Sequence, residues 1–402
     1  MKINLIRLSN SLDPNANFKK EDDQFIEDLN NELFDFDIEL VSDKKDSKYS
    51  IVFIETGGSE QHFVKIEKDL PRPIIMLSTC KNNSLPACFE IKTYLANKDE
   101  DSIILFGNAQ ELAGSISETS KLLTARNYVE GSSLGVIGKP SDWLIASKVD
   151  NNEVKKKFNI NLIDIPSSEL KEEIDKGVLD DIPHLDNINK LGKDNEYLEG
   201  ALRIYSGIKR IVEKYNLKGF TIRCFDLIEE YKNTACLALA MLNDEGIIGT
   251  CEGDVPSLLT MFFVRAVSEQ PSFQANPSKI DLKTGNVMFA HCTVPLSMVK
   301  NINFMTHFES GLGIGIRGDL SERDISIVKI TPKLDRALFL NGKIVANPKL
   351  SNYCRTQIEV KFEDDEGLYN LLREDFGNHV IVVYGNILNE FLNLLHFYNQ
   401  KK

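Results

Sequence analysis

The chain has 402 residues, of which 42% are hydrophobic and 27% are charged, and its formal net charge is −13 at pH 7. An acidic chain without a basic cluster argues against a nucleic-acid-binding surface, because such a surface needs concentrated lysine and arginine. No apolar run approaches the roughly 20 residues that span a membrane, and the first residues lack a signal-peptide pattern. The seven cysteines are scattered and contain no C-x-x-C pair, which fits a reducing compartment. We therefore expect a cytoplasmic globular protein of two or three domains.

Residues 1–130 alternate short apolar runs with helical patterns, which predicts a parallel sheet covered by helices on both faces. The expected strands are Ile3–Leu8, Ile38–Val41, Ser50–Ile54, Ile74–Ser78 and Ile103–Phe106. The expected helices are Glu21–Phe34, a segment that ends at Tyr94 and a segment that ends at Leu123.

Residues 131–270 predict a second α/β unit of the same kind. The expected strands are Ser133–Gly138, Asn161–Ile165, Gly219–Cys224 and Ile247–Thr250. The expected helices are Ser167–Lys176, Glu196–Tyr215, Ala235–Leu242 and Pro256–Val267. Asp180–Asn195 is acidic and polar, so we expect a loop there.

Residues 271–402 change in character, because short β-patterns follow one another at even spacing. The expected strands are Val287–Ala290, Gly313–Ile316, Ser326–Thr331, Ala337–Leu340, Thr356–Phe362 and His379–Tyr384. Such a run predicts a barrel or a sandwich, and the pair Asn341-Gly342 predicts a hairpin turn. Helices are expected at Glu366–Arg373 and Ile387–Phe397.

The most specific stretch is Cys251-Glu252-Gly253-Asp254, which joins a short strand to a helix. Asp254 is placed as the helix N-cap, and Pro256 lies in the first helical turn. Glu252 therefore lies in the loop just past the carboxyl end of a strand. That is where α/β proteins gather their functional residues.

Four segments together resemble the L-fucose isomerase and L-arabinose isomerase-like family of sugar ketol-isomerases. They are Cys251–Asp254 with the helix after it, Ser272–Asn276, Ala290–Cys292 and Gly377–Val380. The resemblance implies two stacked three-layer α/β domains, 1–130 and 131–270. It also implies a β-rich, barrel-like C-terminal domain, 271–402, that carries His379.

The resemblance also implies a metal site. The family binds manganese, or a similar divalent cation, through a glutamate, an acidic residue about one helix later and a histidine near the C-terminus. These positions correspond to Glu252, Asn276 and His379. Asn276 departs from the family pattern, which has an aspartate there, and the loss of one anionic ligand predicts a weaker metal site.

The implied reaction moves a proton between C1 and C2 of a monosaccharide through an enediol, with the cation as Lewis acid. The family uses its glutamate and aspartate both as ligands and as proton carriers. Asn276 offers a carbonyl oxygen but cannot carry a proton at neutral pH. Three hypotheses follow: an isomerase that uses Glu252 alone or with Asp254 or His291, a fold with altered sugar chemistry, or a non-catalytic carbohydrate-binding protein.

Other residues are candidates for contacts with the sugar. His291 follows an apolar strand and is expected in the same cavity, and His307 is a weaker candidate. Trp143 has two interpretations, as a wall of the sugar pocket or as a packing residue. Ser59 and Asn83 lie in loops that contact sugar hydroxyls in one interpretation and are ordinary turn and N-cap residues in the other. Family members assemble active sites between subunits, so we expect a homo-oligomer, a trimer or hexamer.

Overall fold

A computed structural model describes residues 1–10, 16–42 and 49–399. The chain forms two compact units, Met1–Leu123 and Thr124–Lys402. The second unit contains both the second α/β region and the β-rich region, and the division into three domains stays a prediction. Among the described residues, no helix is both long enough and apolar enough to cross a membrane.

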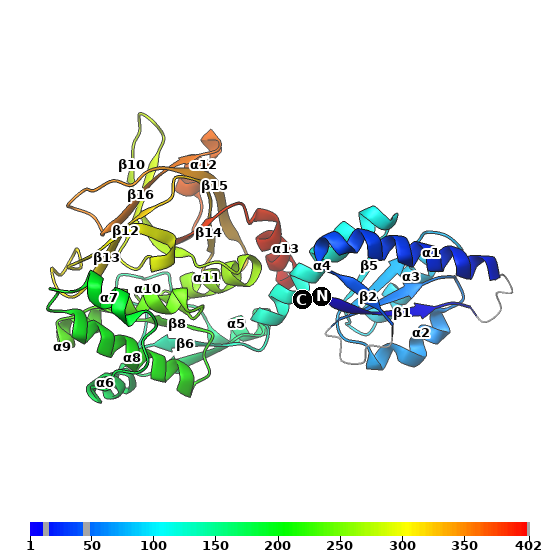
Figure 1. The fold of residues 1–402 in the computed structure, drawn as a ribbon, viewed down its shortest axis with the longest axis horizontal. Coiled ribbons are helices and arrows are strands. Elements are labelled where there is room, and N and C mark those ends of the chain that lie inside the picture. Colours follow the sequence, from blue (N-terminus) through cyan, green and yellow to red (C-terminus); the bar gives the residue numbers. More distant parts are fainter. Residues whose placement is uncertain (11–15, 43–48, 400–402) are drawn as a thin grey trace. The chain divides into compact units, whose positions relative to one another are not determined.

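The first unit contains a parallel sheet flanked by helices (Figure 1). Its strand order is β2-β1-β3-β4-β5. Its strands are β1 (Lys2–Leu8), β2 (Glu39–Val41), β3 (Ser50–Ile54), β4 (Ile74–Ser78) and β5 (Ser102–Phe106). Its helices are α1 (Ala16–Leu33), α2 (Glu60–Ile66), α3 (Ser84–Ala96) and the part up to Leu123 of α4 (Ala109–Val129). Apolar residues of α1 and α4 share one core cluster and those of α2 and α3 another, so helices cover both faces, as expected.

The second unit begins with another parallel sheet, in the order β7-β6-β8-β9. Its strands are β6 (Ser133–Ile137), β7 (Asn161–Ile165), β8 (Gly219–Ile222) and β9 (Ile248–Thr250). The helices of this region are α5 (Asn151–Phe158), α6 (Ser167–Asp175), α7 (Leu185–Leu191), α8 (Leu198–Lys214), α9 (Phe225–Tyr231), α10 (Cys236–Asp244) and α11 (Val255–Ser268).

A closed antiparallel barrel follows, with strand order β10-β11-β16-β15-β14-β17. Its strands are β10 (Phe273–Ile280), β11 (Val287–His291), β14 (Asp324–Ile330), β15 (Ala337–Ala346), β16 (Thr356–Phe362) and β17 (Val380–Tyr384). The remaining elements are β12 (Val299–Met305), β13 (Gly315–Leu320), α12 (Asp365–Arg373) and α13 (Leu388–Asn399). The expected fold class, α/β sheets followed by a barrel-like β-rich region, is confirmed.

Helix α11 connects the parallel sheet with the barrel. It contacts β8 and β9 of the sheet, β14 and β17 of the barrel, and α13. Residues from Val255 to Val264 are consequently all buried, because the helix has apolar partners on every side. The loop before α11 therefore lies where sheet and barrel meet, and it carries Glu252.

Two local expectations were wrong. The segment Asp180–Asn195 contains helix α7, and Ile182 and Ile188 are both buried, so a few apolar contacts order a segment whose composition is polar. Asn341-Gly342 is not a hairpin turn but lies inside β15, where both residues pair with β14. A Cβ atom on Gly342 would lie 2.8 Å from Val360 Cγ1, so this glycine allows the close approach of β16 instead.

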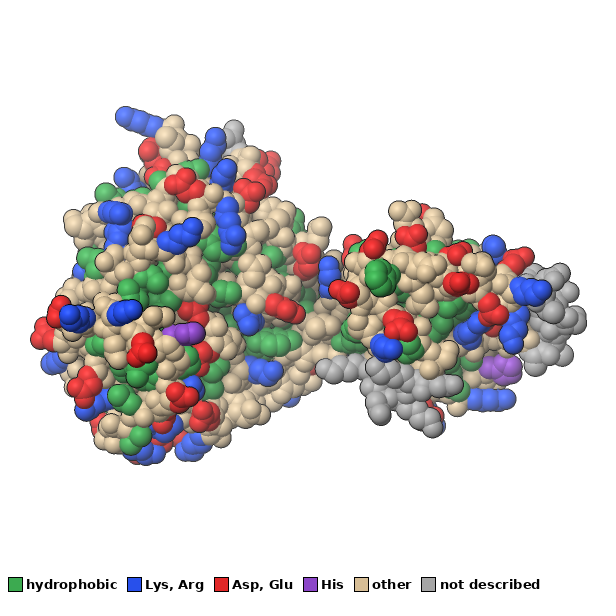
Figure 2. Space-filling model, viewed as in Figure 1, with side chains coloured by type: hydrophobic (Ala, Val, Ile, Leu, Met, Phe, Trp, Pro, Cys, Tyr) green, Lys and Arg blue, Asp and Glu red, His purple; other side chains and the backbone are tan. Residues whose placement is uncertain are grey.

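The visible surface carries both signs of charge. Figure 2 shows lysine and arginine side chains distributed among aspartate and glutamate on the face in view. Although the net charge is −13, this face has no single-sign field of large extent.

Candidate active site

The Glu252 loop adopts a backbone conformation that few residues favour. Glu252 and Gly253 both have positive φ angles, +66° and +71°, and a non-glycine residue in this region is uncommon. A Cβ atom on Gly253 would lie 2.6 Å from the carbonyl oxygen of Lys139, so only glycine fits there. The strained turn ends where Asp254 caps α11, accepting from the Ser257 amide at 2.9 Å. Strain of this kind is concentrated at functional sites.

Neighbouring segments fix this loop from two sides. The side chain of Gln274 on β10 accepts from the Cys251 amide at 2.8 Å and faces the Cys251 carbonyl oxygen at 3.5 Å. The carbonyl oxygen of Glu252 accepts from the Ser141 amide at 2.9 Å. Trp143 Nε1 donates to Glu252 Oε2 at 2.7 Å. The carboxylate is therefore held in one orientation by groups distant in sequence.

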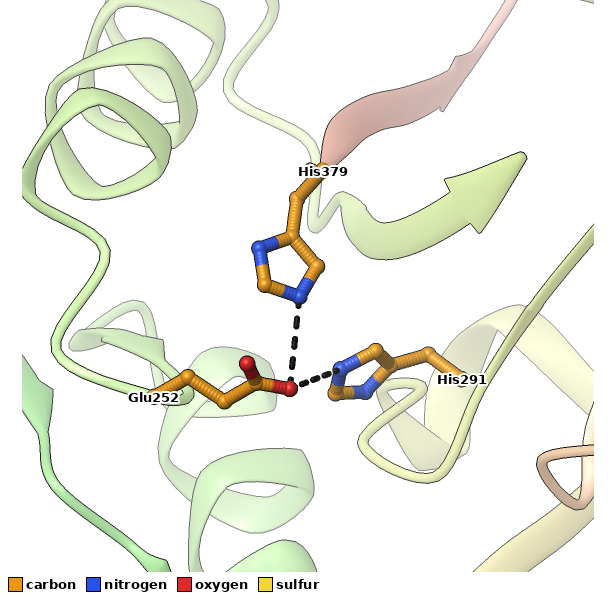
Figure 3. Close-up of side chains that lie close together, drawn as sticks. All are labelled: Glu252, His291 and His379. Carbon is orange, nitrogen blue, oxygen red and sulfur yellow. Dashed lines mark ion pairs between the residues drawn. The ribbon is translucent and has the colours of Figure 1, made fainter. Parts of the chain in front are cut away.

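Two histidines from the barrel converge on this carboxylate (Figure 3). Glu252 Oε1 lies 3.5 Å from His379 Nε2 and 3.9 Å from His291 Nε2. One ligand atom from each of the three residues falls within 4.8 Å of the others. His291 ends β11 and His379 immediately precedes β17. The fold thus brings together the loop after β9, the end of β11 and the residue before β17.

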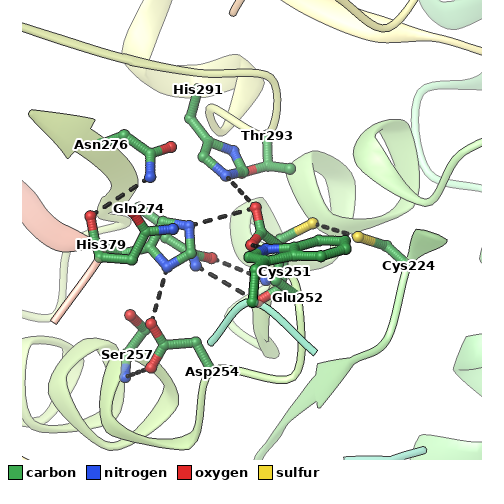
Figure 4. Close-up of polar contacts among 12 residues, drawn as sticks. Cys224, Cys251, Glu252, Asp254, Ser257, Gln274, Asn276, His291, Thr293 and His379 are labelled. Atoms are coloured by element: carbon green, nitrogen blue, oxygen red, sulfur yellow. Dashed lines mark hydrogen bonds and ion pairs between the residues drawn. The ribbon is translucent and has the colours of Figure 1, made fainter. Parts of the chain in front are cut away.

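The far side of His379 is bound by Asp254 (Figure 4). His379 Nδ1 lies 2.8 Å from Asp254 Oδ2, and both side chains are fully buried. A carboxylate only accepts hydrogen bonds, so Nδ1 carries the proton and donates. His379 Nε2 is buried and has no hydrogen-bond partner among the described residues. In the neutral ring, its lone pair is therefore available to a ligand beside Glu252.

The charges at the site shift one another's pKa. Burial raises the pKa of the Glu252 carboxyl, but contacts with His291 and His379 outweigh burial and hold that pKa well below its usual range. Burial lowers the pKa of His379, but the carboxylates of Asp254 and Glu252 raise it above its ordinary value. Burial lowers the pKa of His291, which Glu252 offsets only in part. Both histidines are buried, but their pKa values shift in opposite directions because His379 has two carboxylate neighbours and His291 has one.

Glu252 and His291 line a cavity of about 450 Å3. Its other walls come from several elements and are formed by Trp143, Phe225, Cys236, Cys251, Asn276, Ser278, Cys292, His307, Phe308, Glu309, Tyr353, Cys354 and Asn378. Trp143 packs edge-on against Phe225 with ring centroids 4.7 Å apart. A cavity of this volume, with polar groups converging at one end, suits a small ligand.

The predicted site residues lie in different places. Asn276 and Trp143 line the cavity with Glu252, and Asn276 Nδ2 donates to the Asn378 carbonyl oxygen at 3.4 Å. Asp254 is not a lining residue but lies behind His379. In the first unit, Ser59 Oγ donates to the Thr56 carbonyl oxygen at 2.8 Å.

Asn83, also in the first unit, has a φ of +59° directly before α3. For Ser59 and Asn83, a role in sugar binding stays a prediction.

The sequence alone does not predict two residues that shape the site, Gln274 and Lys329, and it predicts a different role for a third, His291. His291 was expected as a sugar contact, whereas its imidazole points to Glu252 together with His379. Gln274 was noted only as part of a motif, and nothing local predicts its bond to the Cys251 backbone. Lys329 was missed, although a lysine inside the apolar run Ile325–Ile330 is an unusual feature that needs a buried partner.

The donor set fits a divalent cation. Two imidazole nitrogens and one carboxylate oxygen suit first-row divalent metals and leave coordination positions open. The buried His379 Nε2 without a hydrogen-bond partner in the described part of the chain agrees with a ligand role. Glu252 and His379 belong to the expected ligand set, His291 is an additional donor, and Asn276 lines the same cavity.

The chain is similar to sugar isomerases. It is 21% identical over 335 residues to sulfoquinovose isomerase of Alkalicoccus urumqiensis, covering 79% of this chain and 75% of the relative. It is 20% identical over 367 residues to sulfoquinovose isomerase of Priestia megaterium, covering 84% and 81%. A sulfoquinovose isomerase of a Clostridium species is 24% identical over 214 residues, covering 49% and 46%. No family model matches the chain. These similarities indicate an enzyme of the isomerase class.

Proposed function

We propose that this protein is an aldose–ketose isomerase that acts on a monosaccharide in the Glu252 cavity with a divalent cation such as Mn2+. The observation that carries this proposal is the convergence of Glu252, His291 and His379 within 4.8 Å. The similarity to sulfoquinovose isomerases over 79–84% of the chain supports the same reaction class.

The three residues would hold the cation through one carboxylate oxygen and two Nε2 atoms. When bound, a divalent cation supplies Lewis acidity that stabilises negative charge on neighbouring sugar oxygens. The protein's own part is to orient the sugar and to exclude water from the buried end of the cavity. Trp143 Nε1, 2.7 Å from Glu252 Oε2, keeps the carboxylate in its productive orientation.

Isomerisation also needs a group that carries a proton, and Asn276 cannot do so. Glu309 is a lining carboxylate from the segment between β12 and β13. Partial burial and the charge of Glu252 raise its pKa, and a carboxyl with a raised pKa takes up a proton more readily. We assign Glu309 as the proton carrier that acts together with Glu252.

The choice of sugar and the assembly belong to the same proposal. Sugars of the fucose and arabinose type are one substrate class, because of the motifs at Glu252 and His379. A sulfonated sugar is a second class, because of the names of the relatives. A trimer or hexamer that completes the site between subunits stays part of the proposal.

A second candidate function is a carbohydrate-binding protein without turnover, and Asn276 is the observation that favours it. The amide replaces an anionic ligand and hydrogen-bonds the Asn378 backbone at 3.4 Å. A weaker cation site would leave a sugar-binding cavity whose chemistry is altered or lost.

Metal content and turnover on the purified protein test the proposal. We expect about one divalent cation per chain, loss of sugar interconversion after chelation, and recovery with Mn2+. Mn2+ should also raise the melting temperature of the chelated protein. Interconversion that is insensitive to chelation would contradict the metal. Stabilisation by sugars without any product would instead support the binding protein.

A further inference from the structure

A buried lysine lies behind the candidate metal centre. Lys329 belongs to β14, and only 1% of its side chain is exposed. Its Nζ lies 3.2 and 3.0 Å from the two carboxylate oxygens of Asp254 and 2.5 Å from Ser257 Oγ. A buried charge is costly unless it is paired and hydrogen-bonded, and here it has three acceptor oxygens from two residues.

Lys329 is the first member of a chain of contacts that ends at the cavity. Asp254 Oδ2 lies 3.0 Å from Lys329 Nζ and 2.8 Å from His379 Nδ1. The opposite nitrogen, His379 Nε2, lies 3.5 Å from Glu252 Oε1. An ammonium, a carboxylate, an imidazole and a second carboxylate therefore follow one another through the interior.

Lys329 contacts both oxygens of Asp254, but the other partners of the two oxygens differ. Oδ1 accepts from the Ser257 amide at 2.9 Å and thereby caps α11. Oδ2 accepts from His379. Helix capping alone needs neither Oδ2 nor a buried ammonium group. Lys329 Nζ lies 3.0 Å from Oδ2, the oxygen that His379 contacts, so it can act on the contact with the histidine as well as on the helix cap.

We propose that Lys329 is a positioning residue of the metal centre, which holds Asp254 as an oriented carboxylate so that His379 presents Nε2 to the cation. This inference rests on the proposed function, because it requires a cation at Glu252, His291 and His379. Groups behind a metal-binding histidine fix its tautomer and ring orientation, and their loss typically weakens metal affinity about 10–100-fold.

Calorimetric titration of the full-length, metal-free protein with MnCl2 tests the inference. Lys329→Met removes the ammonium group and keeps the side-chain length, and we expect its Kd for Mn2+ to rise about tenfold. Lys157→Met is the matched control, because Lys157 is half-buried and donates to the Leu334 carbonyl oxygen, away from the site. Its Kd should equal that of the wild type.

A merely structural lysine would give a different result. In that case Lys329→Met would lower the melting temperature but bind Mn2+ with wild-type affinity, and this outcome would overturn the inference. If Lys329→Met does not fold, the double variant Lys329→Met/Asp254→Asn removes both buried charges together. We expect it to fold and to bind Mn2+ at least about tenfold more weakly, and wild-type affinity would again overturn the inference.

The wild-type titration separates this inference from the proposed function. No Mn2+ binding by the wild type would overturn both the metal proposal and the role of Lys329. Binding by the wild type with equal affinity in Lys329→Met would overturn the role of Lys329 alone.

Discussion

The residues at the two ends of the cavity are held in different ways. At the inner end, Glu252, His291 and His379 come from a strained turn and two barrel strands, and buried partners fix them. At the outer end, His307 and Glu309 belong to the segment between β12 and β13, and Glu309 is exposed. The inner end holds charged donors in one geometry. The outer end is a loop whose sequence can change without disturbing the hydrophobic core. In the proposed function the inner end therefore holds the cation, whereas the outer end supplies the proton carrier Glu309 on a loop that can also vary with the substrate.

Glu252→Gln should give the largest effect, because it removes the anionic donor at the inner end while keeping its size. We expect turnover to fall at least about 100-fold and Mn2+ binding to become undetectable by calorimetry. Residual activity near the wild-type level would contradict the assignment of Glu252.

Glu309→Gln is the matched change at the outer end. It should lower turnover, because a proton carrier is lost, but leave Mn2+ affinity unchanged. The comparison fails if both glutamine variants lose the metal, since the two ends would then not have separate roles.

Asn276→Asp should have an intermediate effect. An added carboxylate that lines the cavity increases the negative charge around the cation, and ligand charge is a main determinant of affinity for hard divalent cations. We expect Mn2+ affinity to rise about tenfold, measured by calorimetry, which corresponds to about 1.4 kcal/mol.

Asn378→Asp is the control for this gain, because Asn378 also lines the cavity but corresponds to no ligand of the family pattern. If both aspartate variants gain equally, the effect is general attraction and Asn276 does not occupy a ligand position.

The smallest expected effect is on how the stability of the fold depends on pH through His307 at the outer end. Burial, and then the charge of His291, lower the pKa of His307 from 6.5 to about 4. The unfolded chain therefore binds a proton near pH 6.5 that the folded chain does not accept until about pH 4. This contribution to stability is fully present above pH 6.5 and is lost as the pH falls toward 4.

His307→Asn should reduce this dependence. Between pH 7 and pH 5, its melting temperature should fall a few degrees less than that of the wild type. His184→Asn, at an exposed histidine in the same unit, should behave as the wild type. Parallel curves for all three proteins would contradict the role of burial at His307.

Local sequence patterns were sufficient where burial and capping act over a few residues. The bounds of β3, β4, β7 and β16 agree with expectation, because each is a short run with strong strand character. Asp254 was placed correctly as the cap of α11. That cap in turn placed Glu252 at the end of β9.

Patterns failed where a partner distant in sequence decides the structure. Asn341-Gly342 has the composition of a turn, but pairing with β14 and β16 keeps it in a strand. The contact between Lys329 and Asp254 joins residues that are 75 positions apart. Local sequence patterns do not predict a contact over such a separation. The resemblance brought Glu252 and His379 together, while the part of His291 required the barrel itself.

The position of helix α11 determines whether the sheet and the barrel can function separately. Because α11 contacts sheet and barrel together, neither part alone carries a complete set of donors. The sheet supplies Glu252, and the barrel supplies both histidines. A chain truncated before His379 would lack one of the three proposed donors and also β17, which contacts α11. If the proposed site is correct, activity requires the sheet and the barrel together, and we expect that neither can be replaced as an independent module.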